Sequence, residues 1–409
     1  MKPGISFRSR QNIAMNNKKF CTIADVADLE TNLREFRQHL HQYPELSNEE
    51  TETAALVASR LRELGYEVTT GIGGHGVIGA MKRGSGTRSI GIRADMDALP
   101  ITEQTGVPYT SKNTGKMHAC GHDGHTAMLL GAAEQLSRSQ HFSGTVNLIF
   151  QPAEESGFNS GAERMLEEGL FERFPCDAVY GLHNHPGYPV GKMMFKSGPF
   201  MAACDTVNIT VYGKGGHAAR PHMTVDPILV ASSIVIALQT LVSRNIDPNE
   251  TAVVTVGSLH SGHAANVIPE TARLEISVRS FDADVRKILE ERIRTLVEHH
   301  ATGYGARTDI EYVPGYPVLV NHQKETEFAQ EIAKELVGEQ NVIENLPAIS
   351  GSEDFAYFLQ QKPGCFLRLG NGDSATLHNP AYNFNDESLL FGAAFWTRLV
   401  ERYLVDKPI

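Results

Sequence analysis

The 409-residue chain has no apolar run that approaches membrane-spanning length, which argues against an integral membrane protein. Cysteine is scarce, and its five copies are scattered without paired spacing, at Cys21, Cys120, Cys176, Cys204 and Cys365. This pattern favours a reducing compartment over a disulfide framework, so we expect a cytoplasmic protein. Basic residues are outnumbered by acidic ones, 37 to 48, and the net charge of -11 disfavours nucleic acid and anionic membranes as partners.

An apolar segment is also missing from the first twenty residues, although their basic side chains are Lys2, Arg8, Arg10, Lys18 and Lys19. A secretory signal needs such a segment. We therefore expect residues 1–20 to be a disordered basic tail, or sequence that precedes a true start at Met15.

Helix-like and strand-like segments alternate along most of the chain. Apolar residues at helical spacing predict a helix that ends near Tyr43, a second one after a capping box of Ser47 and Glu50, and a buried one over Thr126–Leu136. Thr145–Phe150 is almost continuously apolar, as central parallel strands are. The alternation predicts an α/β fold with a doubly wound, mostly parallel sheet, whose ligands bind at the C-terminal ends of the strands.

The pattern changes after about residue 200. The predicted elements become strand, helix, two strands, helix and strand, over Thr206–Tyr212, Asp226–Val242, Ala252–Gly257, Ala272–Arg279, Asp282–His299 and Thr308–Val313. This βαββαβ order is that of a ferredoxin-like α+β sandwich. We expect residues 200–314 to form an inserted domain and residues 21–199 and 315–409 to form the main domain together, because one core rarely organises a chain of this length.

Gly71–Gly76 matches the GxGxxG pattern of dinucleotide-binding proteins. The pyrophosphate in such proteins sits at a helix N-terminus, whereas the segment that follows here, Val77–Met81, is strand-like. We therefore interpret the glycines as a turn and reject the nucleotide-dependent oxidoreductase that the pattern suggests.

Met117–His125, with the sequence MHACGHDGH, places one thiol, three imidazoles and one carboxylate within nine residues. Thiolate and imidazole together suit divalent metals such as zinc, cobalt, nickel and manganese. The alternative is a reduced structural cysteine beside surface histidines, and other segments have to decide between the two.

Glu154 and Glu155 leave a predicted buried strand as adjacent carboxylates, which repel each other unless cations or protons hold them. A metal site explains the pair, because one carboxylate can bind metal while the other, Glu154, acts as general base on water. His183 ends another predicted strand, where His185 competes for the same role, and His378 follows a later strand. The candidate ligands, enough for two metal ions, are then Cys120, His122, Glu155, His183 and His378.

The chain resembles the amidohydrolases of metallopeptidase family M20, in the branch that contains hippurate hydrolases and N-acyl-amino-acid deacylases. The resemblance covers nearly the whole chain after the tail, with motifs at Leu40–Ser47, Arg93–Pro100, Met117–His125, Gln151–Glu155, Gly213–Ala218, Gly351–Phe355 and Leu377–Pro380. It implies two divalent ions per subunit, of manganese, zinc, cobalt or nickel, with Glu154 as the catalytic base. The ligands that it implies are Cys120, His122, Glu155, His183 and His378.

The chain departs from part of this family. In many relatives outside the branch, a histidine and a bridging aspartate serve where this chain has Arg93 and His122. The resemblance also implies that three further carboxylates orient the metal ligands, namely Asp95, Asp97 and Asp123.

In this family the inserted domain resembles a lid that also forms a homodimer interface. On that resemblance, His217 reaches the active site of the other subunit and stabilises the oxyanion, and the glycines around it permit an exposed turn. Asn266 and Arg279 match positions that bind the substrate's carboxylate, for which Arg279 is suited as a bidentate clamp, and Gly351 is a further expected substrate-binding residue. We therefore expect a homodimer formed through residues 200–314.

These features predict a metal-dependent enzyme, of the hippurate hydrolase or aminoacylase type, that hydrolyses the amide bond between an acyl or aroyl group and an amino acid. An N-acetyl-diaminopimelate deacetylase or an aminoacyl dipeptidase stays open, because both use the same metals and base. A non-catalytic metal- or peptide-binding protein is the alternative class, and Glu154 argues against it, because a pure binder needs no general base.

Overall fold

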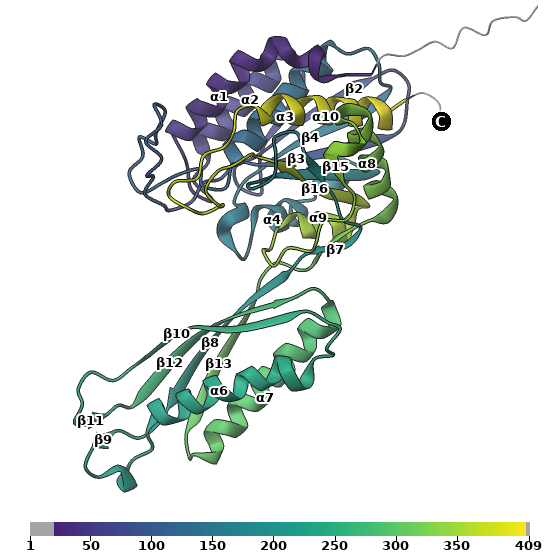
Figure 1. Ribbon diagram of the computed structural model, residues 1–409. Helices are drawn as coiled ribbons and strands as arrows, with labels where there is room; N and C mark the ends of the chain where they lie inside the picture. The colour runs from purple at the N-terminus through teal and green to yellow at the C-terminus, as the bar shows by residue number, and fades with distance from the viewer. Residues whose placement is uncertain (1–19, 406–409) are drawn as a thin grey trace, which may run out of the picture.

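The apolar runs of the sequence form an eight-stranded sheet in the computed structural model, which describes residues 20–405 (Figure 1). Its order is β1-β2-β4-β3-β5-β16-β6-β15, with β1 (Glu67–Ile72), β2 (Gly76–Arg83), β3 (Ser89–Asp95), β4 (Gly144–Gln151), β5 (Ala178–His185), β6 (Met193–Met194), β15 (Val342–Ile343) and β16 (Gly364–Gly370). The four central strands, β4-β3-β5-β16, are parallel, which confirms the predicted sheet. Met15 and the predicted basic tail, up to residue 19, lie outside the described residues.

Helices cover both faces of the sheet, which is why its central strands are almost wholly apolar. Val146, Leu148 and Phe150 of β4 point into the core under one set of helices, and Ile149 points into the opposite core. The first set is α1 (Glu30–Gln42), α2 (Thr51–Glu63), α3 (His122–Arg138), α8 (Gln323–Val337) and α10 (Ser388–Tyr403). The second set is α4 (Gly161–Glu167), α5 (Leu170–Arg173) and α9 (Phe355–Gln361).

The predicted capping box at the start of α2 is wrong. Ser47 Oγ donates instead to Asp97 Oδ2 at 2.6 Å, and Glu50 is buried with its Oε1 accepting from the amide of Ala153 at 2.7 Å. The Glu45 carboxylate takes over the cap, accepting from two backbone amides of the first turn at 3.1 and 2.8 Å. The two side chains predicted to form the capping box instead make hydrogen bonds with loops that are distant in the sequence. The local spacing was therefore not sufficient to predict the cap.

The Gly71–Gly76 segment is the hairpin between β1 and β2. Ile72 pairs with Gly76 across the turn, and β2 continues as a strand with no helix at this point. The interpretation of the glycines as a turn is therefore confirmed.

Residues 203–314 form a second, antiparallel sheet with two helices on one face, here called the four-stranded unit (Figure 1). Its order is β10-β12-β8-β13, built from β8 (Ala203–Tyr212), α6 (Pro227–Asn245), β10 (Ala252–Ser261), β12 (Thr271–Ser280), α7 (Ala283–Gly303) and β13 (Arg307–Pro314). This is the predicted βαββαβ succession, and it has a hydrophobic core of its own. A short ribbon of β9 (Gly216–His217) and β11 (Val267–Ile268) lies at its end farthest from the large sheet.

Where the chain passes between the two sheets, β7 (Gly198–Met201) pairs with β14 (Leu319–Asn321). Among the described helices, only α6 is long and apolar enough to cross a membrane by length and composition. One side of α6 packs on the sheet of the four-stranded unit, while Leu229 and Ile236 on the other side are 56% and 72% exposed.

Candidate active site

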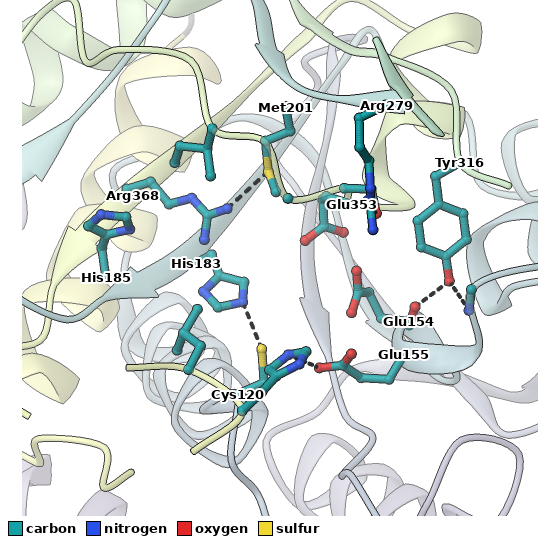
Figure 2. A pocket seen from close by; sticks show the side chains of 16 residues that line it. Cys120, Glu154, Glu155, His183, His185, Met201, Arg279, Tyr316, Glu353 and Arg368 are labelled. Carbon is teal, nitrogen blue, oxygen red and sulfur yellow. Dashed lines mark hydrogen bonds and ion pairs between the residues drawn. The ribbon is translucent and has the colours of Figure 1, made fainter. Parts of the chain in front are cut away.

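A cavity of about 300 Å³ opens at the edge where the central parallel strands end (Figure 2). Cys120 lies just before α3, Glu154 and Glu155 follow β4, and His183 lies on β5. His378 comes from a loop after β16. The structure thus brings these predicted groups to one place, as expected for side chains at the carboxyl ends of neighbouring strands.

Two backbone turns aim these side chains into the cavity. Ala153 has φ 52° and ψ 45°, a left-handed conformation that is uncommon outside glycine and recurs at functional sites. It starts the single 3-10 turn Glu154–Ser156 (η2). Gly121 has φ 92° at the start of α3, and a β-carbon there would lie 2.3 Å from Asn184 Nδ2, so only glycine fits.

Hydrogen bonds at Nδ1 orient the imidazoles of His183 and His122. His183 Nδ1 lies 2.7 Å from the carbonyl oxygen of Asn184, and His122 Nδ1 lies 3.1 Å from Asp97 Oδ1. Both acceptors require the Nδ1–H tautomer, which leaves each Nε2 lone pair free. His183 Nε2 lies 3.2 Å from Cys120 Sγ, and His122 Nε2 is buried without a hydrogen-bond partner among the described residues.

Glu155 completes the donor set. Its Oε1 lies 3.2 Å from His378 Nε2 and 3.9 Å from His122 Nε2. Donor atoms of Cys120, His122 and His183 lie within 4.8 Å of one another, as do those of Cys120, Glu155 and His378. A thiol, imidazoles and a carboxylate that converge around an orphaned buried Nε2 fit divalent metal ions.

The pKa shifts of the site residues also support a site for divalent metal ions. Burial, with Glu155 and Glu154 nearby, raises the pKa of the Cys120 thiol well above its ordinary value. Burial, with Glu353 and Glu155, likewise raises the pKa of Glu154. Burial lowers the pKa of His122, but Asp95 and Asp97 outweigh it and raise this pKa to about 10. Divalent cations oppose all three shifts, because they favour thiolate, carboxylate and neutral imidazole.

Arg93, the residue at which the chain was expected to depart from part of the family, organises a group of carboxylates. Its buried guanidinium donates to Asp95 Oδ2 at 2.7 Å and to Glu353 Oε1 and Asp354 Oδ1, both at 2.9 Å. Glu353 and Asp354 have carboxylate oxygens within 4.8 Å of Glu154. The Arg93 charge therefore offsets a group of acids that would otherwise repel the carboxylate of Glu154.

Of the three aspartates expected to orient ligands, Asp97 contacts the candidate ligand His122 directly. Asp95 Oδ1 lies 2.6 Å from His125 Nδ1, and its Oδ2 lies 3.6 Å from His122 Nε2. Asp123 does not play the expected part. It pairs with His41 Nδ1 at 2.9 Å and lies 3.5 Å from Arg37, because its helical position turns it away from the cavity.

The His41–Asp123 pair makes a prediction about stability. Burial lowers the pKa of His41, but hydrogen bonds with Asp123 and Glu103 outweigh it and raise this pKa to about 9. Because the folded pKa lies above the unfolded value, the pair stabilises fully below about pH 6.5 and loses its contribution as the pH rises through 9. The contribution is on the order of 3 kcal/mol. The melting-temperature gap between wild type and His41→Gln should therefore shrink from pH 6.5 to pH 9.5, and a constant gap would contradict this.

The predicted substrate-binding residues divide into two groups. Arg279 and Gly351 line the cavity, and Figure 2 shows Arg279 on the same side of it as Glu353. Arg279 Nη1 donates to Ser352 Oγ at 3.0 Å. His217 and Asn266 are exposed and lie on or next to the β9–β11 ribbon, at the far end of the four-stranded unit (Figure 1). Within one subunit the structure does not bring these two residues to the cavity.

Several lining residues were not predicted from the sequence. Tyr316 donates from its hydroxyl to the main-chain oxygen of Glu154, and Arg368 and His185 line another side of the cavity (Figure 2). A sequence signal existed for Arg368, which is a charged residue inside the apolar run Cys365–Leu369. Tyr316 gave no signal, because its partner lies 162 residues earlier in the chain.

Comparison with known proteins gives a consistent assignment. Residues 91–402 match the model of peptidase family M20/M25/M40. A hippurate hydrolase of Campylobacter jejuni is 44% identical over 93% of this chain and 99% of its own. An N-acetyl-L-cysteine deacetylase of Bacillus subtilis is 39% identical over 97% and 94% of the two chains. A solved Bacillus subtilis structure, described as a dinuclear metal-binding peptidase of the M20 family, superposes with a TM-score of 0.80 at 36% identity, covering 92% of this chain and 99% of its own.

Proposed function

Because this chain belongs to peptidase family M20/M25/M40, we propose that it hydrolyses the amide bond of N-acyl amino acids to a carboxylic acid and a free amino acid. The observation that carries the proposal is the convergence of metal-binding donors around one further carboxylate, Glu154, at the edge of the cavity. We assign Cys120, His122, Glu155, His183 and His378 as ligands of two divalent ions.

When bound, such ions lower the pKa of water and polarise the scissile carbonyl. Glu154 takes the proton from the attacking water and later delivers it to the leaving amine. The backbone of Glu154 is fixed for this role, because the Tyr316 hydroxyl donates to its carbonyl oxygen and accepts from the amide of Gly157 at 2.8 Å.

Arg279 holds the α-carboxylate of the substrate together with Asn266 of the partner subunit, and Gly351 lines the same part of the cavity. The Arg279 guanidinium presents parallel donors that match a carboxylate, and Ser352 already orients one of its nitrogens. Holding this end of the substrate places the scissile carbonyl near Glu154. This positioning raises the rate of the chemical step, in addition to the binding affinity that the contact supplies.

The partner subunit's His217 and Asn266 complete the site in a homodimer. Their place at the far end of the four-stranded unit supports this, because neither reaches the cavity of its own subunit (Figure 1). The exposed apolar side of α6, with Leu229 and Ile236, suits the dimer contact.

A complementation experiment tests this arrangement. His217→Ala and Glu154→Gln should each be nearly inactive alone as purified dimers. After subunit exchange, a mixed dimer regains one site with an intact Glu154 and the partner subunit's His217, so activity should return to about a quarter of the wild-type level. If His217 acted on its own subunit's site, mixing would restore nothing.

A substrate panel tests the reaction itself. The purified chain, loaded in turn with manganese, cobalt, nickel and zinc, should release amino acid from benzoyl-, acetyl- and indoleacetyl-amino acids. N-acetyl-diaminopimelate and a dipeptide belong to the same panel as the competing substrates. Binding of metal without turnover of any of them would favour a binding protein instead.

The five cysteines, none of them in a disulfide, suit the reducing cytoplasm as the site of action.

A further inference from the structure

Arg368 is a buried arginine for which the structure provides no counter-ion. Three arginines are buried within residues 20–405: Arg37, Arg93 and Arg368. Arg37 pairs with Asp386 at 2.7 Å, and Arg93 pairs with three carboxylates. Arg368 has no carboxylate within 4.0 Å among these residues. A buried charge without a partner is costly, so its retention calls for an explanation.

Arg368 also lacks strong hydrogen-bond acceptors among the described residues. Its Nη2 donates only to Met201 Sδ, at 3.0 Å, and thioether sulfur is a weak acceptor. Its Nε is buried and has no hydrogen-bond partner within residues 20–405. Of the nearby acids, Glu353 accepts from Arg93 through its Oε1 and forms no ion pair with Arg368 among the described residues. The guanidinium therefore retains most of its capacity to bind an acceptor.

Arg368 faces the active-site cavity and shares one corner of it with His185 (Figure 2). Its backbone on β16 is in register with the candidate ligand His183 on β5, which brings the two side chains to the same strand end. In the part of the chain that the structure describes, His185 Nδ1 is also buried without a hydrogen-bond partner. Two unpartnered ring or guanidinium nitrogens in one corner suit an anion.

The corner adjoins the part of the cavity assigned to the amino acid. A β-carbon built on Gly351 would lie 3.6 Å from Met201 Cε and 3.8 Å from Ile349 Cγ2, and Met201 in turn contacts Arg368. A substrate held at Gly351 and Arg279 therefore has its further groups within reach of this corner.

We propose that Arg368 and His185 form a second anion site in the cavity, which binds a carboxylate of the substrate additional to the α-carboxylate held by Arg279. The inference rests on the proposed function and narrows its substrate class to N-acyl amino acids with two carboxylates. The second carboxylate comes from an acidic amino acid, such as glutamate, or from a dicarboxylic acyl group, such as succinyl.

Pairs of substrates that differ only in this charge test the proposal. N-benzoyl-L-glutamate is compared with N-benzoyl-L-glutamine, and N-succinylglycine with its terminal amide, all with metal-loaded dimeric enzyme. The wild type should prefer the acid in one pair, which identifies the source of the anion. Arg368→Met should lower that kcat/KM ratio by about 10- to 100-fold, as expected for a lost hydrogen-bonded charge pair. Arg368→Lys keeps the charge but not the fork, so it should retain part of the preference.

Arg279→Met is the matched control, because every substrate in the panel has the α-carboxylate. It should lower kcat/KM for acid and amide alike and leave their ratio unchanged. If wild type shows no preference in either pair, or Arg368→Met lowers acid and amide equally, the second anion site is refuted while the proposed function stands. If no N-acyl amino acid is hydrolysed by the metal-loaded wild type, it is the proposed function that fails.

Discussion

Glu154→Gln should lower kcat for hippurate by about 1,000- to 10,000-fold while the protein keeps its metal ions. Glutamine matches glutamate in size but cannot take a proton from water, so only the base function is removed. Glu154 suits this function because burial beside other acids raises its pKa, which strengthens it as a proton acceptor, while bound cations would oppose this shift enough to keep the carboxylate ionised. The measurement is steady-state turnover together with metal content of the same preparation.

Glu155→Gln is the matched control for this experiment. It changes the neighbouring carboxylate, whose Oε1 lies within 3.2 to 3.9 Å of two imidazoles, so it should lose metal as well as activity. The two variants therefore separate base from ligand. Near-normal turnover of the glutamine variant at position 154, with metals bound, would remove Glu154 from the role of base.

Removal of metal should lower the rate of hydrolysis by at least about 1,000-fold. Polarisation of the carbonyl and activation of water by the metal supply several kcal/mol of the rate acceleration. Dialysis against a chelator followed by assay in metal-free buffer measures this loss. Added divalent ions should restore the rate. The chelated protein should also melt at a lower temperature, because metal bound only to the folded state stabilises it.

Cys120→Ser sharpens the same experiment. Its Sγ lies 3.2 Å from His183 Nε2, so the substitution replaces one soft donor among nitrogen and oxygen donors. Affinity for zinc and cobalt should fall more than affinity for manganese, because thiolate selects the softer ions. An unchanged order of metal affinities, measured by competition, would place Cys120 outside the metal site. Full activity of the chelated wild type would overturn the whole metal assignment.

The groups at strand ends could be predicted from the sequence because two local signals coincide there. A nearly continuous apolar run marks a strand buried on both faces, and the polar residues after it must then lie at one edge of the sheet. The sequence therefore predicts Glu154, Glu155 and His183 at this edge, and the structure places all three around the cavity.

The misinterpreted residues share one cause, which is contact with a distant segment. Ser47 and Glu50 have the spacing of a capping box, but Asp97 and Ala153, about 50 and 100 residues later, take their hydrogen bonds. Asp123 sits beside a candidate ligand in the sequence and points away from it in space. The spacing of residues in the sequence indicates which secondary-structure element they form. The hydrogen-bond partners of these side chains depend instead on how the elements pack against one another.

The contact between Tyr316 and Glu154 has a consequence for motion. Gly315, just before it, marks the exit from the four-stranded unit, and a β-carbon there would lie 3.0 Å from the carbonyl oxygen of Gly157. If this unit rotates about its two chain crossings, the axis of the rotation lies beside the proposed base, Glu154. Such a rotation would leave Glu154 nearly still and would displace the β9–β11 ribbon, at the opposite end, farthest, so that substrate and product could exchange while the proton-transfer geometry is kept.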